Sequence, residues 1–275
     1  MAKMEEKYTV KEKHVVKIGI IGGTGVYDPA ILSGTKEVKV HTPYGPTSDM
    51  FLTGKFSGID VVFLPRHGKN HSLNPSNVPY RANIWALKQL GVTHILAPTA
   101  VGSLKENIKP GDIVFPDQFI DRTTNRKSTF YEGSQVCHIS TAEPFCVNLR
   151  GLLTKVAKSL SIKYHSKATC VVIEGPRFST RAESQLYQSW KADIINMTMV
   201  PECVLAREAE ICYQSIAMVT DYDCWKTHVV DAEMVGRVMK ENITKVQKLL
   251  AEAIPRIAEL PEDCSCRHAL EGAFI

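Results

Sequence analysis

Polar side chains follow five apolar runs of this sequence, and their types suit the binding of an anion next to a carboxylic acid. The apolar runs have the composition of strands buried on both faces, and ligands of open α/β proteins gather at the carboxyl ends of such strands. One polar strand end would mean little, but five predict a single site assembled across a sheet. These ends carry Thr24, Arg66 with His67, Thr99, Asn196 with Thr198, and Asp221 with Asp223.

The anion-binding part of this set rests on two features. Arg66 and His67 follow an apolar run together, and the guanidinium fork of arginine matches the oxygens of a phosphate. The turn at residues 22–25 (GGTG) lets the backbone approach an anion closely. It lacks the third glycine of a dinucleotide-binding fingerprint, and no G-K-[ST] of a P-loop follows it. We therefore expect phosphate, or a phosphorylated substrate, held beside the two aspartates.

Other chemistries find less support in the residue spacing. The sequence contains no H-x-x-x-H or H-E-x-x-H, and His67 and His71 lack a third clear ligand, so no metal is expected. No G-x-S-x-G elbow marks a serine nucleophile. Eight cysteines without repeated C-x-x-C pairs are typical of reduced thiols in a cytosolic protein. The only close pair, Cys264 and Cys266, has the wrong spacing for the usual zinc knuckles.

The composition is that of an ordinary globular protein, with 44% hydrophobic and 23% charged residues among 275. A formal net charge of +4 with scattered basic residues does not favour nucleic acid as a partner. No apolar run reaches the length of a membrane span, and the N-terminus lacks the apolar core of a signal peptide. We expect a soluble intracellular protein without nucleic-acid or membrane partners.

Strands and helices alternate along the chain, without a linker or a repeat. This order predicts a single domain over residues 1–275, with a central mixed, largely parallel twisted sheet flanked by helices. Residues 1–14 carry mixed charges and are expected to form a frayed arm. The predicted strands are 15–21, 50–56, 61–64, 94–97, 113–119, 168–173, 194–197 and 211–220, and the predicted helices are 77–90, 149–160, 181–190, 201–206 and 232–257.

The residues named above occur in motifs that together resemble the trimeric purine nucleoside phosphorylase superfamily, and within it the 5′-methylthioadenosine phosphorylase branch. The resemblance covers nearly the whole chain up to the long final helix, while the tail at 261–275 diverges. The motifs are IGIIGGTG (18–25), RHG (66–68), ANIWALK (82–88), GDIVFPDQFIDRT (111–123), IEGPRFS (173–179), INMT (195–198) and VTDYD (219–223).

The resemblance implies reversible phosphorolysis of S-methyl-5′-thioadenosine to adenine and 5-methylthioribose 1-phosphate, a step of methionine and adenine salvage. Orthophosphate would be a co-substrate, and no cofactor is expected. The implied location is the cytoplasm, with the nucleus as a second compartment. Carried over residue by residue, the phosphate would be held by Thr24, Arg66, His67, Thr99, Ala100 and Thr198.

The nucleoside would be held by residues of the later motifs. Met197 would contact the ribose hydroxyls, and Phe178 would pack against base and sugar. Asn196 and His71 are counted with the substrate-binding residues. Val235 and Met239, one helical turn apart, are apolar enough to line a methylthio pocket near Ser179, although core packing is the alternative reading for both.

The family resemblance also implies a homotrimer. In the family, His138 would reach the 5′ pocket of a neighbouring subunit, which requires such an assembly. The active sites would then lie near the subunit interfaces.

The two aspartates would act on the purine. A departing purine needs its charge relieved at N7, and a buried aspartic acid with a raised pKa can donate a proton there. We expect Asp221 to be this acid. Aspartate also at position 223 favours a 6-amino purine over a 6-oxo purine, because a carboxylate accepts a hydrogen bond from the amino group.

Three alternatives stay open at the level of sequence. The first is a broader purine nucleoside phosphorylase that accepts adenosine or inosine. The second is a nucleosidase that uses water, which the arginine and histidine of the phosphate set disfavour. The third is a non-catalytic purine-binding module, which would bind adenine without turnover.

Overall fold

The computed structural model describes residues 15–23, 25–26, 32–226 and 232–275. The expected N-terminal arm at 1–14 and the predicted phosphate ligand Thr24 lie outside the described residues. Within the described part of the chain, no helix is long and apolar enough to cross a membrane.

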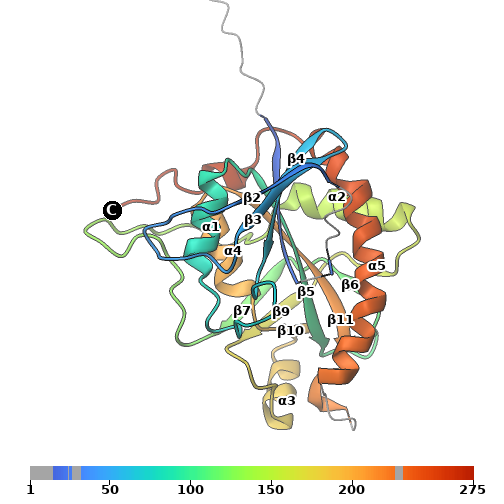
Figure 1. Cartoon of the computed structure of the whole chain (residues 1–275). Helices are drawn as coiled ribbons and strands as arrows, with labels where there is room; N and C mark the ends of the chain where they lie inside the picture. The colour runs from blue at the N-terminus through green and yellow to red at the C-terminus, as the bar shows by residue number, and fades with distance from the viewer. Residues whose placement is uncertain (1–14, 24, 27–31, 227–231) are drawn as a thin grey trace, which may run out of the picture.

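The described residues form one mixed sheet of 11 strands, as the alternating pattern predicted (Figure 1). Its main path runs in the order β2-β3-β4-β1-β5-β10-β9-β7, and β11, β6 and β8 continue from β5. The strands are β1 (Lys17–Gly22), β2 (Ser33–Val38), β3 (Phe51–Phe56), β4 (Ile59–Pro65), β5 (His94–Ser103), β6 (Ile113–Val114), β7 (Gln118–Arg122), β8 (Tyr164–His165), β9 (Thr169–Ile173), β10 (Ile194–Asn196) and β11 (Cys212–Asp221).

Strand β5 organises the centre of this sheet. It runs parallel to β1 and, over nearly its whole length, parallel to β11. Since β4 is also parallel to β1, the carboxyl ends of β4, β1, β5 and β11 all point the same way. β10 pairs antiparallel with the last residues of β5, at Gly102 and Ser103, and so delivers its own carboxyl end to the side of β5.

Helices cover both faces of the sheet, with α1 and α4 on one side and α2 and α5 on the other (Figure 1). Successive residues of β5 show the two-residue period that this arrangement needs: Ile95 and Ala97 belong to one buried core, and Leu96 belongs to the other. The helices are α1 (Tyr80–Gln89), α2 (Val147–Ser159), α3 (Arg181–Ser189), α4 (Met199–Glu208) and α5 (Ala232–Ile257), with short 3₁₀ turns η2 (Asp223–Trp225) and η3 (Ser265–His268).

Some predicted elements differ from the structure for local reasons. The single strand expected at 113–119 is divided into β6 and β7, which pair with different neighbours, and Pro116 between them cannot donate a ladder hydrogen bond. Helix α1 begins at Tyr80 instead of 77, because Pro79 disfavours helical backbone at the residue before it. Strand β2 was missed, since its six residues carry almost no burial and no apolar alternation.

The segment at 194–206 folds as a strand followed by a helix, as predicted. β10 ends at Asn196, and the assigned helix α4 contains a non-helical residue, Val200 (φ −109°, ψ 131°). Regular helix therefore begins at Pro201, whose ring suits the first turn of a helix because no amide donor is needed there. The short linker between strand and helix holds the polar residues of the predicted site.

Candidate active site

A cavity of about 510 Å³ opens at the carboxyl ends of the central strands. It brings together most of the residues predicted from sequence, which are contributed by segments spread from 66 to 239. The predicted residues that line it are Arg66, His67, His71, Thr99, Ala100, Phe178, Ser179, Asn196, Met197, Thr198, Asp221, Asp223, Val235 and Met239.

Two threonine hydroxyls stand together on one side of the cavity. Thr99 belongs to β5 and Thr198 follows β10, and their Oγ1 atoms are 3.2 Å apart. Both residues are buried, with 8% and 5% of their surface exposed. Strand β5 continues beyond the predicted end at 97 because β11 pairs alongside it as far as Gly102, so Thr99 lies within a strand. Two adjacent hydroxyl donors are suited to binding the oxygens of an anion.

Asn196 fixes the positions of these hydroxyls. Its Nδ2 donates to Thr99 Oγ1 at 3.0 Å and to the Ala100 carbonyl oxygen at 2.9 Å. Its Oδ1 accepts from the backbone N–H groups of Thr198, at 2.8 Å, and Met199, at 2.7 Å. The amide thus uses both of its hydrogens and both of its acceptor positions on protein groups. It ties β5 to the start of α4.

Arg66 is buried, and its guanidinium fork is paired with Glu202. Nε lies 2.7 Å from one carboxylate oxygen and Nη2 lies 2.8 Å from the other. The Pro98 and Ile21 carbonyl oxygens accept two further hydrogen bonds. Four of the five N–H groups of Arg66 are therefore used among the described residues, which leaves one Nη1 hydrogen for the cavity. We expected the guanidinium fork itself to bind phosphate. In the structure, its Nε and Nη2 groups bind Glu202 instead.

The charge of Arg66 is secured by this pairing. Burial acts against a charged guanidinium, but the neighbouring Glu202 carboxylate raises the pKa of Arg66 above its ordinary value. Tyr213 donates from its hydroxyl to the same carboxylate at 2.9 Å. The cavity is thus bordered by a charged guanidinium whose position is fixed by buried contacts and whose charge is balanced by Glu202.

His67 is a neutral side chain at neutral pH. Burial lowers its pKa to about 4, and the Arg66 charge adds to this effect. Its Nδ1 lies 2.8 Å from the Leu73 carbonyl oxygen, which can only accept, so Nδ1 carries the proton and Nε2 is left as an acceptor. The ring stacks on His71 with centroids 4.4 Å apart. The free Nε2 of this neutral tautomer can accept a hydrogen bond from a hydrogen phosphate.

Two buried aspartates form the acidic part of the cavity. Burial raises the pKa of both Asp221 and Asp223 above the ordinary value for an aspartate. Asp221 Oδ1 accepts from the Asp223 backbone N–H at 2.7 Å, and Oδ2 lies 2.7 Å from Thr220 Oγ1. Thr220 Oγ1 is also 3.2 Å from the Val101 carbonyl oxygen. Because the hydroxyl can donate either to that carbonyl or to Asp221, the site accommodates Asp221 with or without a proton.

Two polar atoms at the cavity are buried and have no hydrogen-bond partner among the described residues. They are Oδ2 of Asp223 and Oγ of Ser179. Buried polar atoms in folded proteins are nearly always paired, so unpaired ones at a cavity indicate groups that await a ligand. Their chemistry, a carboxyl oxygen and a hydroxyl, suits a ligand with amino or ring-nitrogen groups.

The remaining wall of the cavity is apolar. Phe178 is 44% exposed there, although it is a large aromatic side chain. Met197 packs closely on Gly175, where an added Cβ would lie 2.6 Å from the Met197 sulfur atom. Val235 and Met239 extend the apolar lining from helix α5. This wall suits the hydrophobic part of a nucleoside-sized ligand.

The match to known families agrees with this geometry. A family model described as "Phosphorylase superfamily" matches residues 17–255. The chain belongs to the phosphorylase superfamily. It is 56% identical over 255 residues to the S-methyl-5′-thioadenosine phosphorylase of Danio rerio, an alignment that covers 90% of this chain and 91% of the relative.

Solved structures extend the comparison to the fold. A methylthioadenosine phosphorylase from an antarctic soil metagenomic library superposes with a TM-score of 0.91 at 45% identity, over 96% of this chain and 93% of the other. A variant of the adenosine/methylthioadenosine phosphorylase of Schistosoma mansoni, solved in complex with methylthioadenosine, gives a TM-score of 0.84 at 44% identity, over 90% and 93%. The predicted fold class is confirmed.

Two predicted site residues are not among the described residues that line the cavity. Thr24 lies outside the described residues. His138 is exposed, and its backbone N–H donates to the Ala273 carbonyl oxygen at 2.7 Å, near the end of the chain. Its proposed role in the pocket of a neighbouring subunit therefore stays a prediction.

Sequence reasoning missed Thr220 and Gly102. The position of Thr220 next to the predicted acid in the sequence is only a weak indication of a role. The contact of the Thr220 hydroxyl with Asp221 is what places Thr220 in the site. At Gly102 an added Cβ would lie 2.9 Å from Asp221 Oδ1, so glycine is needed where the strand backbone approaches the acid. Neither role follows from a local pattern.

Proposed function

We propose that this chain catalyses the reversible phosphorolysis of S-methyl-5′-thioadenosine to adenine and 5-methylthioribose 1-phosphate, in methionine and purine salvage. The observation that carries the proposal is the convergence, in one cavity, of an anion-binding group and a buried carboxyl pair. The similarity to named S-methyl-5′-thioadenosine phosphorylases across most of the chain supports the same reaction. The enzyme is a pentosyltransferase with orthophosphate as its co-substrate, and it acts without a further cofactor.

The reaction breaks the bond between C1′ of the sugar and N9 of the purine. The bonding electron pair leaves with the purine, and the sugar gains oxocarbenium character, as in glycoside hydrolysis. An oxygen of the phosphate dianion then bonds to C1′. The paired hydroxyls of Thr99 and Thr198, the Ala100 backbone, Arg66 and His67 hold this phosphate beneath the sugar, with Thr24 as a further ligand. Positioning and charge stabilisation thus replace a protein nucleophile.

Asn196 is a positioning residue in this scheme. Its side-chain amide is hydrogen-bonded to Thr99, Ala100 and the start of α4. Asn196 therefore acts on phosphate through those groups and does not need to contact the substrate itself. Glu202 has the same kind of role toward Arg66. Both residues keep their partners aligned before the phosphate arrives.

Asp221 and Asp223 act on the departing adenine. Asp221, whose raised pKa favours the protonated acid, supplies the proton for N7. Oδ2 of Asp223, for which the described residues offer no hydrogen-bond partner, accepts a hydrogen bond from the 6-amino group. An inosine-type base presents a carbonyl oxygen at that position, which a carboxylate would repel. The pair therefore selects adenine.

The sugar and the 5′ substituent fill the apolar side. Met197 contacts the ribose, Phe178 packs against base and sugar, and Val235 and Met239 enclose the methylthio group beside Ser179. His71 stacks on His67 and borders the same cavity.

We also propose a homotrimer in which His138 reaches the 5′ pocket of a neighbouring subunit. This assembly is supported by its exposed position on a long loop paired with the C-terminal tail. The proposed location is the cytoplasm, with the nucleus as a second compartment.

A substrate panel tests the reaction. Methylthioadenosine, adenosine and inosine are each incubated with and without phosphate, and release of the base is followed. We expect adenine from methylthioadenosine only when phosphate is present, with the sugar recovered as its 1-phosphate. Preference for inosine would overturn the role given to the aspartates. Adenine release without phosphate would indicate a nucleosidase.

Adenosine acceptance is the main alternative within the same chemistry. The related Schistosoma mansoni enzyme is named an adenosine/methylthioadenosine phosphorylase, which supports some turnover of adenosine in this group. The ratio of kcat/KM for the two nucleosides decides between a dedicated and a broad enzyme. The apolar pair Val235 and Met239 favours methylthioadenosine, since one apolar group in a pocket is worth roughly 1–3 kcal/mol of discrimination.

A further inference from the structure

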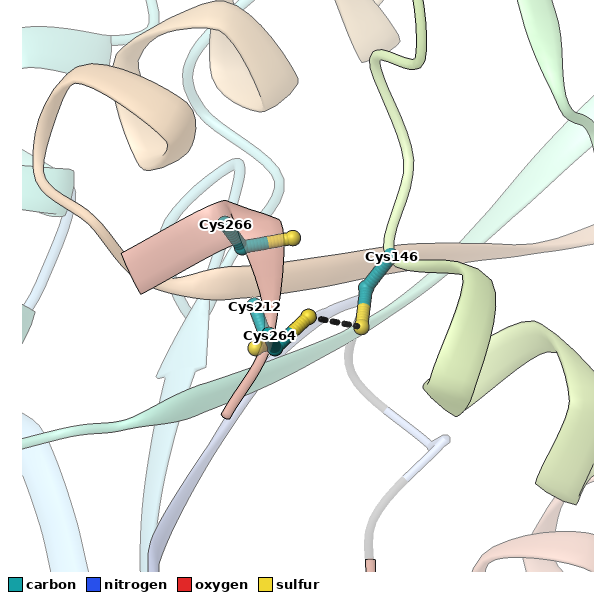
Figure 2. Close-up of side chains that lie close together, drawn as sticks. All are labelled: Cys146, Cys212, Cys264 and Cys266. Atoms are coloured by element: carbon teal, nitrogen blue, oxygen red, sulfur yellow. Dashed lines mark hydrogen bonds between the residues drawn. The ribbon is translucent and has the colours of Figure 1, made fainter. Parts of the chain in front are cut away.

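Four cysteines from distant parts of the sequence have their side chains close together (Figure 2). Cys212 is at the amino end of β11, whose carboxyl end borders the cavity. Cys146 is the N-cap of α2, Cys212 is the first residue of β11, and Cys264 and Cys266 lie at the short helix η3. Their four sulfur atoms all lie within 4.8 Å of one another. Three of these residues are buried and Cys264 is half-buried.

The four sulfur atoms lie close enough together for one metal ion to bind them all. Zinc binds thiolates at about 2.3 Å, so the edges of a four-sulfur tetrahedron around it measure about 3.8 Å. Cys146 Sγ and Cys264 Sγ are 3.7 Å apart. We propose that Cys146, Cys212, Cys264 and Cys266 bind one structural zinc ion. Four thiolates without an open position are the ligand set of closed, non-catalytic zinc sites.

Groups around the cluster favour thiolates over thiols. The buried Arg207 donates from Nη1 to Cys266 Sγ at 3.9 Å, a contact that stabilises negative charge on sulfur. The backbone N–H of Leu149 donates to Cys146 Sγ at 3.5 Å, in the first turn of α2. Thiolates are stabilised at helix N-termini and beside arginine, and outer donors of this kind surround metal-bound sulfur.

Such a zinc ion would hold the C-terminal tail on the domain. The cluster joins the tail at 264–266 to α2 and β11, which contribute residues to the same buried core as Leu96. Beyond it, Phe274 forms a β-bridge with Cys137, and Ile275 donates from its backbone N–H to the Val136 carbonyl oxygen at 3.2 Å. The loop that carries His138 is therefore tethered to a tail whose own anchor is the cluster.

Metal analysis of the purified full-length protein tests the proposal directly. The protein is expressed with supplemented zinc, purified with a reducing agent and without chelator, and its tag is removed. We expect one zinc per chain by elemental mass spectrometry. X-ray absorption at the zinc edge should show four sulfur neighbours at about 2.3 Å. Replacement of zinc by cobalt should give the visible spectrum of tetrahedral cobalt thiolate.

Variants with matched controls separate the cluster from the other cysteines. Cys212→Ser and Cys266→Ser should each weaken zinc binding on the order of tenfold or more and lower the Tm. Cys170→Ser and Cys137→Ser, which alter a buried and a half-buried cysteine outside the cluster, should keep one zinc per chain. Removal of zinc by a chelator should lower the Tm of the unmodified protein, and added zinc should restore it.

Several outcomes would overturn the proposal. One is wild-type protein with four reduced cluster thiols that binds neither added zinc nor cobalt. Another is a metal-free protein in which non-reducing peptide mass spectrometry finds disulfides among these cysteines, each bond with the loss of two hydrogens. Stoichiometric iron instead of zinc would overturn the choice of metal. The wild-type measurements decide the matter even if the cysteine variants fail to fold.

Discussion

The two ends of strand β11 carry clusters of opposite character. Asp221 at its carboxyl end faces the cavity, while Cys212 at its amino end belongs to the four-cysteine cluster. The two residues are the first and the last of a ten-residue strand, which places them about 30 Å apart. At the carboxyl end, functional groups surround an open volume, and two of their polar atoms have no hydrogen-bond partner in the described part of the chain. At the amino end, the sulfur atoms lie against one another.

This difference separates a site built for a substrate from one built for stability. Groups that converge around a space can exchange one ligand for another, and each turnover needs that space. Groups that converge on a single point can hold only an ion or each other. Variants at the two ends should therefore affect different quantities, with turnover at the carboxyl end and unfolding at the amino end. Four predictions test this division, in order of expected size.

The largest effect is expected from Asp221→Asn. Loss of the proton donor should lower kcat/KM for methylthioadenosine by about 10²–10⁴-fold, the usual contribution of a general acid, with little change in Tm. The measurement is phosphate-dependent adenine release. Asp60→Asn, which alters a surface aspartate paired with Lys55, serves as the control. Nearly full turnover by Asp221→Asn would show that Asp221 is not the general acid.

Glu202→Ala should change both stability and phosphate binding, although Glu202 belongs to the carboxyl end of the sheet, where we expect effects mainly on turnover. Removing one partner of a buried ion pair leaves the Arg66 charge uncompensated and should cost about 3–5 kcal/mol of unfolding free energy. Glu252→Ala breaks an exposed pair with Arg256 and should cost only about 0.3–0.5 kcal/mol. Urea unfolding of both variants measures the contrast. Equal losses would show that the Arg66 pair is not structurally important.

Acid should weaken both ends, through one histidine at each. The pKa values of His67, beside the cavity, and His94, paired in register with Cys212, are both lowered to about 4 by burial, from an ordinary 6.5. Between pH 6.5 and 4, these two histidines bind protons in the unfolded chain but not in the folded chain. Their contribution to the free energy of unfolding is therefore complete above pH 6.5 and is lost as the pH falls toward 4. Each histidine should contribute about 1–3 kcal/mol to this fall.

Urea unfolding at several pH values checks this dependence. His94→Gln and His67→Gln should each flatten the fall in stability below pH 6.5. His268→Gln is the control, because the hydrogen bond with Glu271 raises the pKa of His268, so this histidine's contribution to stability is complete below pH 6.5 and is lost only as the pH rises above 6.5. Its removal should leave the fall below pH 6.5 unchanged. An unchanged slope in both His67→Gln and His94→Gln would contradict the assignment.

The smallest of the four effects is expected from Asn196→Ala. Loss of the amide that aligns the two threonines should raise the KM for phosphate about tenfold, equivalent to one of the roughly 1–3 kcal/mol penalties for unpaired buried groups, with a smaller change in kcat. Asn242→Ala removes a buried amide that donates to the Val219 carbonyl oxygen away from the cavity. It should lower stability and leave the phosphate KM unchanged. Equal effects of the two variants on KM would make Asn196 merely structural.

The fold and much of the site could be predicted from local patterns. Apolar runs and helical periodicity located the central strands and the final helix at 232–257, which the structure reproduces at the same bounds. The pattern failed at β2, which has no buried face, and at 113–119, where Pro116 divides two strands. In both cases the missing information was which neighbour the segment would pair with.

The sequence by itself determined the order of elements, the family, and the placement of an anion-binding group and an acid pair at strand ends. These depend on residue type and on short spacing, which local backbone preferences express. Only the tertiary structure decided that the Arg66 fork belongs to Glu202, 136 residues away, and that Asn196 holds Thr99. It alone placed Cys146 against Cys264, 118 residues apart. Such contacts arise from sheet register and the path of the tail, which depend on the packing of the whole domain.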